Sequence, residues 1–514
     1  MILHRIKGIV TSLQKPGQSQ LERLVALLFY LASANLFVVF FVQGGYDVTL
    51  GPVHIHAYSM KKWLLLCLAL ALARMWLEGK RKGIPVLEGI QSPLILFLSV
   101  VFLYSANDRT FNTHDAFAAR LLPLSLIREF DFDLDEFADI SGPLIPRFLL
   151  PLNGHIVSSH PPWTAVVALP VFLVPVLMGG PPTSFLALLD LEKRAAVLTV
   201  ALSVLILLFA VRRLTCRNIA WLIAVAYALG TSSFSTSSQA LWQHGSAQLF
   251  LSLTIYALVR GLETPRFITY AGLALGGAVI CRPHTVLVAL PIAAYVFHKH
   301  RDQFVRFVLA GLPPLLMFVT YNAFYFGSPF ATGLSQSVVS PASLIARHVN
   351  WFSTPILEGF AAVLISPSRG LFVYSPILLV SLIGMLIAWR EPGQHLLKYL
   401  SIGVFLHLIP VATLGQWWGG VAYGPRLLSD TLPIWCLLLY LPFERLERSG
   451  WGWYLIGAWL LISIGMHALG VYGDDSQYPL ERDLEFHPEL RWSWTNSQPV
   501  YIARKILAAL KETF

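Results

Sequence analysis

The sequence predicts an all-α polytopic membrane protein with about thirteen transmembrane helices. The first observation is the composition, because 56% of the 514 residues are apolar and only 13% are charged. The second is run length, since apolar runs of about 20 residues, such as residues 24–42, can cross a hydrocarbon layer of ~30 Å. The third is that Lys and Arg cluster in short stretches between these runs, as they do in cytoplasmic loops.

The expected spans follow from the apolar runs, taken in chain order. They cover residues 21–43, 62–78, 89–106, 195–212, 218–235, 245–260, 267–281, 284–298, 304–325, 371–389, 396–413, 430–443 and 452–471. With a cytoplasmic N-terminus, the N-terminal tail and six short inner loops hold more than half of the 37 Lys and Arg residues. The longer connecting segments then lie outside. Residues 164–182 contain internal prolines and end in Gly-Gly-Pro-Pro, so we expect a short, broken or interfacial helix there.

The distribution of charge and of cysteine disfavours a nucleic-acid partner, a disulfide framework and a cysteine metal site. The formal charge of +9 does not gather in a basic stripe, so a nucleic-acid partner is not expected. The four cysteines lie far apart without paired spacing, so neither a disulfide framework nor a cysteine metal site is predicted.

An acidic stretch stands out at the start of the expected outer loop 107–194. It contains eight acids, namely Asp108, Asp115, Glu129, Asp131, Asp133, Asp135, Glu136 and Asp139. Asn112 or Thr113 can cap a helix from residue 114 to about 129, which places Asp115 in its first turn. The helix dipole favours an acid there without any function. However, Asp115 closely follows a span, where lipid and aqueous substrates meet, and is therefore the candidate general base.

A second acidic cluster, DFDLDEF at residues 131–137, offers Asp133, Asp135 and Glu136. The cluster is either a solvated loop that anchors two apolar side chains in the interface, or a site that orients an acceptor hydroxyl or holds a divalent cation such as Mg²⁺ or Mn²⁺. His160, in the following SSHPPW motif, is a further candidate for acceptor or metal binding. No zinc site is expected, because no two histidines of the outer segments have ligand spacing on one helix.

Three arginines lie at outer ends of expected spans, namely Arg282, Arg369 and Arg426. Each could reach water by snorkelling, but together they could also bind the phosphate of a lipid donor. Four neighbouring side chains are candidates for contact with a sugar, namely Trp242, His244, Trp418 and Tyr423. The aromatic ones are equally consistent with an interfacial aromatic belt.

These motifs resemble those of the GT-C fold glycosyltransferases, in particular the branch of the protein O-mannosyltransferases and the lipid A aminoarabinose transferase. The resemblance is carried by NTHDAFAARLLPLSL around Asp115, by the second acidic site, by HPPW, and by residues 195–217, which lead into a basic turn. It implies a polyprenyl-phosphate sugar donor, a glycolipid, polysaccharide or protein acceptor, and inversion at the anomeric carbon with Asp115 as base. It requires no cofactor, although a divalent cation could assist.

Thirteen spans after a cytoplasmic N-terminus place the C-terminus outside, and the resemblance implies a bacterial inner membrane in which that side is the periplasm. We expect two N-terminal transmembrane helices in residues 1–84, a GT-C-like catalytic module in 85–330, further transmembrane helices in 331–471 and a periplasmic interfacial tail in 472–514. The tail ends in an amphipathic pattern typical of a helix on the membrane surface. Two alternatives stay open: a flippase or transporter of lipid-linked glycans, and an O-antigen polymerase or ligase that relies on arginine or histidine.

Overall fold

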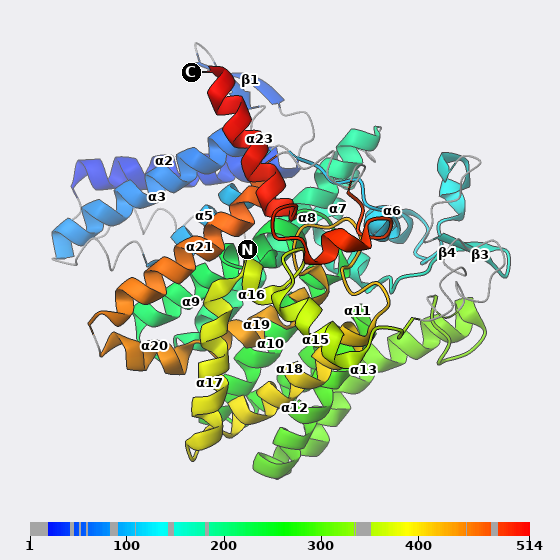
Figure 1. Ribbon diagram of the computed structural model, residues 1–514. Coiled ribbons are helices and arrows are strands. Elements are labelled where there is room, and N and C mark those ends of the chain that lie inside the picture. The colour runs from blue at the N-terminus through cyan, green and yellow to red at the C-terminus, as the bar shows by residue number, and fades with distance from the viewer. Residues whose placement is uncertain are drawn as a thin grey trace. The chain divides into compact units, whose positions relative to one another are not determined.

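The computed structural model is mainly helical, with two short β-hairpins in addition to the predicted helices (Figure 1). It describes residues 19–41, 46–50, 53–57, 60–82, 91–107, 109–141, 149–179, 184–333, 335, 351–448, 450–473 and 482–513. The chain divides into two units, the first formed by residues 1–108 and 171–188 and the second by residues 109–170 and 189–514.

The first unit contains a pair of packed helices, α2 (Gln20–Phe41) and α3 (Met60–Lys82). Small and apolar residues at helical spacing, such as Ala26 and Phe29 on α2, form the buried face. The antiparallel strands β1 (Tyr46–Leu50) and β2 (Val53–Ala57) connect the two helices. Helix α5 (Pro93–Ser105) packs on α3 and follows Ser92 with a proline at its first position, where no backbone N–H is needed.

The second unit holds the remaining elements, and α7 and α8 run across the boundary between the units. The helices are α6 (Phe117–Arg128), α7 (Trp163–Gly179), α8 (Phe185–Val211), α9 (Arg217–Leu229), α10 (Gln243–Glu263), α11 (Phe267–Cys281), α12 (Val286–Lys299), α13 (Arg301–Phe326), α15 (Ile356–Ile365), α16 (Leu371–Tyr374), α17 (Leu379–Arg390), α18 (His395–Thr413), α19 (Leu432–Leu437), α20 (Tyr440–Glu447), α21 (Gly452–Tyr472) and α23 (Gln498–Thr513). Strands β3 (Leu149–Leu152) and β4 (His155–Ser158) form an antiparallel hairpin.

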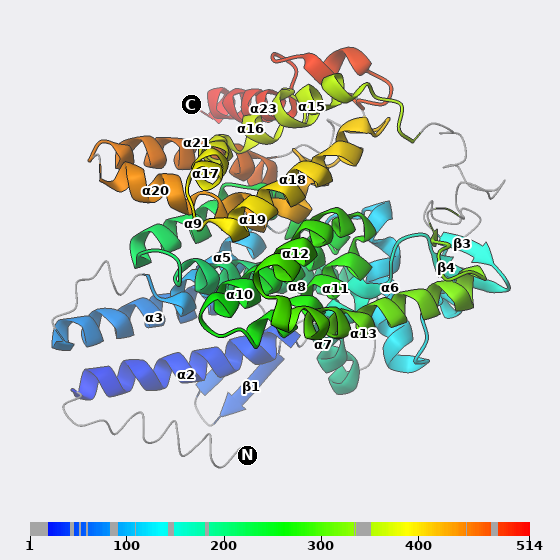
Figure 2. The ribbon, with the colours of Figure 1, turned by 90° about the horizontal axis from the view of Figure 1, so that it is seen from below.

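Helices α10, α11 and α13 pack side by side in this unit (Figure 2). Their close approach depends on small residues. A Cβ atom at Gly272 of α11 would lie 2.0 Å from the carbonyl oxygen of Phe307 on α13, and one at Gly277 would lie 2.7 Å from the ring of Phe250 on α10. Glycine at these two positions therefore allows the helices to pack in contact.

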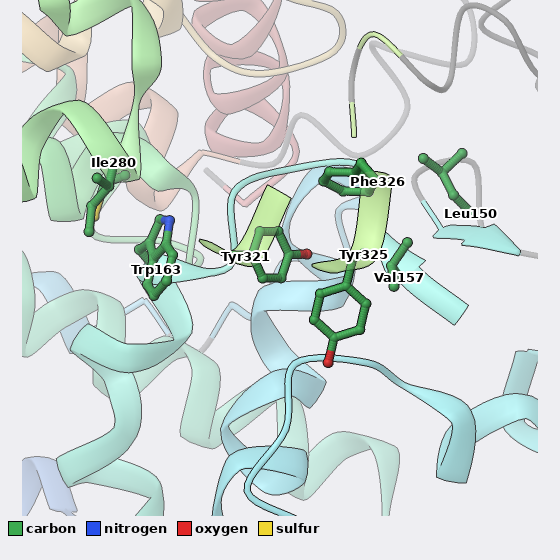
Figure 3. Packing of buried hydrophobic residues seen from close by; sticks show 8 residues of the cluster. Leu150, Val157, Trp163, Ile280, Tyr321, Tyr325 and Phe326 are labelled. Carbon is green, nitrogen blue, oxygen red and sulfur yellow. The ribbon is translucent and has the colours of Figure 1, made fainter. Parts of the chain in front are cut away.

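An aromatic cluster joins the β3–β4 hairpin to the end of α13 (Figure 3). Tyr321 and Tyr325 of α13 pack with their ring centroids 5.0 Å apart, and Trp163 lies 5.9 Å from Tyr321. Val157 of β4 is fully buried in the same cluster. The hairpin, and with it the acidic segment that pairs with β4, is therefore held on the helix bundle.

Within the described residues, six helices are long and apolar enough to span a membrane, or seven if a pair of helices bent by 43° counts as one span. The prediction of thirteen spans is therefore not confirmed in number. The expected span 430–443 corresponds to the bent pair Arg426–Leu437 and Tyr440–Glu447. The expected span 371–389 is interrupted after α16, because Pro376 has no backbone N–H to continue the helix.

Helix α8 is longer than the span expected there, whereas the helices expected within residues 164–182 and at the end of the tail are present. Helix α8 begins at Phe185, ten residues before the expected span at 195, and its charged residues Glu192 and Lys193 have buried partners in Leu241 and Gln239. Helix α7 is a continuous helix of 17 residues in spite of its prolines. The terminal helix α23 buries Ile502 against Tyr374 and Tyr423, while the rest of its apolar face is exposed.

Candidate active site

The turn that presents Asp115 forms for local reasons. Thr113 is the helix cap, since its Oγ1 accepts a hydrogen bond of 3.3 Å from the backbone N–H of Ala116. Asp115 lies in the 3₁₀ turn His114–Ala116, directly before α6. Ala116 is fully buried against Trp242, which fixes the turn on the start of α10.

The carboxylate of Asp115 forms an ion pair with Arg426. Its Oδ2 lies 2.5 Å from Nη1 of Arg426, and the two side chains are 27% and 14% exposed, respectively. The guanidinium of Arg426 also lies 5.7 Å from the ring centroid of Trp242, a cation–π contact. Asp115, Trp242 and Arg426, three of the predicted site residues, therefore lie together.

Asp115 is an ionised carboxylate at physiological pH. Burial by itself would raise its pKa, but the charge of Arg426 and its hydrogen bond lower the pKa to about 2. Burial lowers the pKa of His160 to about 4, with Asp115 opposing and the cations of Arg282 and Arg426 adding to the shift. His160 is therefore neutral at pH 7 and contributes no fixed charge to the site.

A second polar cluster forms around Asp430, which is fully buried in the 3₁₀ turn Arg426–Thr431. His244 Nδ1 lies 2.7 Å from its Oδ1, and His284 Nε2 lies 2.9 Å from its Oδ2. Arg282 donates from Nε to the same Oδ2 at 3.2 Å. Arg282 also donates from Nη1 to Gln243 at 3.1 Å.

The two clusters are adjacent because they share two elements. One turn carries both Arg426 and Asp430, and the start of α10 carries both Trp242 and His244. Asp430 was not among the site residues predicted from the sequence. The available signal was an acid four residues after Arg426, immediately before an apolar run, where an unpaired carboxylate would be costly.

The second acidic segment forms a separate group beside the β3–β4 hairpin. His155 Nδ1 lies 2.8 Å from Asp135 Oδ2 and 3.2 Å from Asp133 Oδ2. Asp133 pairs with Val157 in an isolated β-bridge and accepts from the Tyr325 hydroxyl at 3.4 Å. The hydrogen bond to Asp135 raises the pKa of His155. Asp133, Asp135 and His155 bring three ligand atoms within 4.8 Å of one another, and their two carboxylates could hold a divalent cation.

Two neighbouring acids, Asp131 and Glu136, also have raised pKa values. Partial burial, followed by repulsion from Asp133 and other acids, raises the pKa of Asp131 to about 6. Burial also raises the pKa of Glu136, whose Oε1 accepts from the Ser125 hydroxyl at 2.5 Å. A cation bound here would relieve the repulsion between these carboxylates.

The third predicted arginine, Arg369, bonds to neither Asp115 nor Asp430 in the described structure but to the loop before Arg426. Arg369 is 3% exposed and donates to the carbonyl oxygens of Trp418 and Gly420, each at 3.0 Å, and of Ser368 at 2.8 Å. It also donates to Gln498 Oε1 of α23 at 3.0 Å. These bonds hold the loop that leads to Arg426. A small cavity lined by Arg369, Trp418 and Arg426 lies next to this loop.

The two aromatic candidates in this region are buried side chains. Trp418 is 4% exposed and packs against Arg491, whose guanidinium lies 3.8 Å from its ring centroid. Tyr423 is 5% exposed and donates to the carbonyl oxygen of Met466 at 2.6 Å. Both rings are thus engaged in packing the loop between α18 and the Arg426–Thr431 turn.

A buried ion pair supports the helix that follows Asp115. Arg120 of α6 bonds to Glu192 of α8, and the two side chains are 0% and 1% exposed. Arg120 also donates to Asn112 Oδ1 at 3.1 Å, while Glu192 Oε1 accepts from the backbone N–H of Leu241 at 3.1 Å. The pair therefore links the segment before Asp115 to the segment before α10. Neither residue was predicted from the sequence.

One stretch of the chain is similar in sequence to a known protein family. Residues 194–322 match the sequence model of the family described as dolichyl-phosphate-mannose-protein mannosyltransferase. A comparison with curated proteins found no match. Among solved structures, the oligosaccharyltransferase of Archaeoglobus fulgidus in its apo form is similar with a TM-score of 0.43 and 12% identity, covering 75% of this chain and 57% of that chain.

The same archaeal enzyme tethered to an acceptor peptide with an NVT sequon gives a TM-score of 0.44 and 13% identity, covering 75% of this chain and 56% of that chain. This chain thus spans somewhat more than half of the enzyme's length. The family match confirms, for residues 194–322, the resemblance to the protein O-mannosyltransferases that the sequence motifs predicted.

Proposed function

We propose that the protein transfers a sugar from a polyprenyl-phosphate donor to an envelope acceptor on the periplasmic face of a bacterial inner membrane. The acceptor is a glycolipid, a polysaccharide or a protein. The observation that carries this proposal is the ion pair between Asp115 and Arg426, a partly exposed carboxylate and cation at the edge of a buried polar cluster. The description of the matched family names a sugar on dolichyl phosphate, which is a polyprenyl phosphate.

In the proposed reaction, Asp115 accepts the proton of the acceptor hydroxyl while that oxygen attacks the anomeric carbon. The bond from the anomeric carbon to the phosphate oxygen breaks, and the phosphate leaves with the electron pair from the opposite face. The configuration at the anomeric carbon inverts. A positioned base of this kind contributes about 10² to 10⁴ in rate.

Arg426 has a double role in this reaction. In the resting site it holds the pKa of Asp115 at about 2, which makes the carboxylate a weak base. A donor phosphate that draws the guanidinium toward itself would weaken this ion pair and raise the pKa of Asp115. Donor binding would then activate the base at the moment it is needed, and Arg426 would stabilise the departing phosphate.

The other candidate residues take roles according to their positions. Arg282 and His244 adjoin the same cluster and suit contact with the donor head group. His160, near Asp115, suits orientation of the acceptor. Asp133 and Asp135, with His155, form the candidate site for a divalent cation, Mg²⁺ or Mn²⁺, and Glu136 lies near Asp133.

We assign Arg369, Trp418 and Tyr423 positioning roles in the loop before Arg426, since their polar groups bond to neighbouring segments of the chain. In this proposal they act on the reaction through Arg426 and do not touch the donor.

One observation favours the transporter alternative. Arg282, His407 and Asp430 form a buried ionisable group between helices, as in many transport pathways. A transporter does not need Asp115 for a chemical step, and an O-antigen polymerase or ligase should depend on arginine or histidine instead. The dependence of sugar transfer on the carboxylate of Asp115 therefore separates the three functions.

The test uses a strain that lacks the gene, complemented with wild-type protein or with Asp115→Asn. Mass spectrometry of envelope glycans and polyprenyl-phosphate sugars should reveal a modification that is lost on deletion, with its lipid-linked donor accumulating. Wild-type protein should restore the modification, whereas Asp115→Asn should leave the donor unconsumed. Asp190→Asn is the matched control, because Asp190 is an exposed partner of Arg194 on α8. Full restoration by Asp115→Asn would refute the assigned base.

A further inference from the structure

Three potential metal ligands, His284, His407 and Asp430, come together from three different elements. His284 lies in the turn between α11 and α12, His407 in α18 and Asp430 in the 3₁₀ turn before α19. One nitrogen from each imidazole and one carboxylate oxygen all lie within 4.8 Å of one another. Asp430 Oδ2 is 2.9 Å from His284 Nε2 and 3.6 Å from His407 Nε2.

His407 is the member of the group whose hydrogen-bonding atoms are unsatisfied among the described residues. Its side chain is fully buried, and neither ring nitrogen has a hydrogen-bond partner within the described part of the chain. Buried polar atoms are nearly always paired in folded proteins. The ring centroids of His407 and His284 lie 4.9 Å apart, and Nε2 of His407 lies near Asp430 Oδ2. A ligand between these groups would therefore satisfy Nε2 of His407.

The ligand set has the chemistry of a zinc site with an open position. Two imidazoles and one carboxylate are the protein ligands of several zinc enzymes, with metal–ligand distances of about 2.0 to 2.2 Å. A tetrahedral ion at such distances separates its ligand atoms by about 3.3 Å, and the two separations from Asp430 Oδ2 bracket this value. His244 donates from Nδ1 to the other carboxylate oxygen at 2.7 Å, which orients Asp430 as outer partners commonly do.

We propose that His284, His407 and Asp430 bind a zinc ion. The inference goes beyond sugar transfer and does not depend on it. Arg282 already balances the charge of Asp430, so a bound Zn²⁺ adds two positive charges that call for an anion. The side chains of His284 and Arg282 are 31% and 17% exposed, which leaves the fourth position accessible to an anionic oxygen.

The direct test is the metal content of the full-length protein purified in detergent. The protein is incubated with zinc chloride, freed of unbound metal by gel filtration, and measured by inductively coupled plasma mass spectrometry. The wild type should retain about one zinc per chain, and His407→Gln and His284→Gln should lose it. X-ray absorption of the wild type should show nitrogen and oxygen ligands, two of them imidazoles.

Two control variants separate this site from other histidines. His487→Gln alters an exposed histidine beside Glu489, and His467→Gln alters a buried histidine that bonds to Ser235 and Ser375. Both should retain zinc. Zinc should also raise the unfolding temperature of the wild type but not of His407→Gln, because only a folded site binds the ion. Wild-type protein without zinc above background, or zinc that persists in both His284→Gln and His407→Gln, would overturn the proposal.

Discussion

Replacement of Glu192 by Gln tests whether the buried ion pair supports the Asp115 segment. The side chain keeps its shape, and its carbonyl oxygen still accepts from the backbone N–H of Leu241. However, the change removes the negative charge that the guanidinium of Arg120 contacts. The amide NH₂ of Gln can also face the guanidinium, which places two hydrogen-bond donors opposite each other. Since Arg120 and Glu192 are 0% and 1% exposed, water cannot replace the lost charge.

The expected loss of folding stability is large for an isosteric change. Removal of one partner of a buried ion pair typically destabilises a protein by about 3 to 5 kcal/mol. The retained bond to Leu241 places Glu192→Gln near the lower end, at about 3 kcal/mol. Glu263→Gln is the matched control, because Glu263 pairs with Arg213 at the surface with side chains 54% and 29% exposed. Such exposed pairs contribute about 0 to 1 kcal/mol.

The assay is unfolding of the purified variants in mixed micelles with increasing dodecyl sulfate, followed by circular dichroism. Glu192→Gln should unfold at a clearly lower detergent fraction than Glu263→Gln. Sugar transfer should also fall in Glu192→Gln, because Arg120 holds Asn112 three residues before Asp115. Equal stability of the two variants would refute the reasoning that burial makes this ion pair essential.

Three further perturbations have defined outcomes. Arg426→Gln should lower the turnover of sugar transfer by about 10² to 10³, measured under saturating donor, whereas a wild-type rate would exclude its role at the leaving phosphate. His160 is neutral in the folded protein with a pKa of about 4, below its ordinary 6.5, so its stabilising contribution is present above pH 6.5 and lost as the pH falls through 4. Thermal unfolding between pH 7 and 4 should therefore show a smaller drop for His160→Gln than for the wild type, and identical drops would contradict this assignment. Gly384→Ala should lower stability by about 1 to 3 kcal/mol, because its Cβ would lie 1.9 Å from the carbonyl oxygen of Leu438, whereas Gly457→Ala, with open space, should be neutral or stabilising.

Local patterns in the sequence were sufficient for the parts of the site that depend on neighbouring residues. The cap before Asp115 is formed by Thr113, one of the two predicted residues, because capping needs only a side-chain oxygen next to the first helical N–H groups. Helix α10 and the expected span 245–260 agree closely for the same reason, since length and hydropathy are local properties. The choice of Asp115 as base remains a prediction from the sequence.

Contacts between distant segments were decided only by tertiary structure. Arg426 and Asp115 are far apart in the chain, and nothing in their local sequences selects that contact over a donor phosphate or water. Asp430 looked like the ordinary start of an apolar run, yet packing of α10, α12 and α18 surrounds it with His244, His284 and His407.

Hydropathy and capping act over a few residues, so the chain alone was enough to predict helices that can span a membrane and an acid that closely follows one apolar helix. Only the tertiary structure decided which arginine meets that acid and that a buried carboxylate gathers three histidines. The physical reason is that ion pairs and ligand sets depend on distances across helices, and these distances are set by packing residues such as Gly272 and Gly384 rather than by sequence separation.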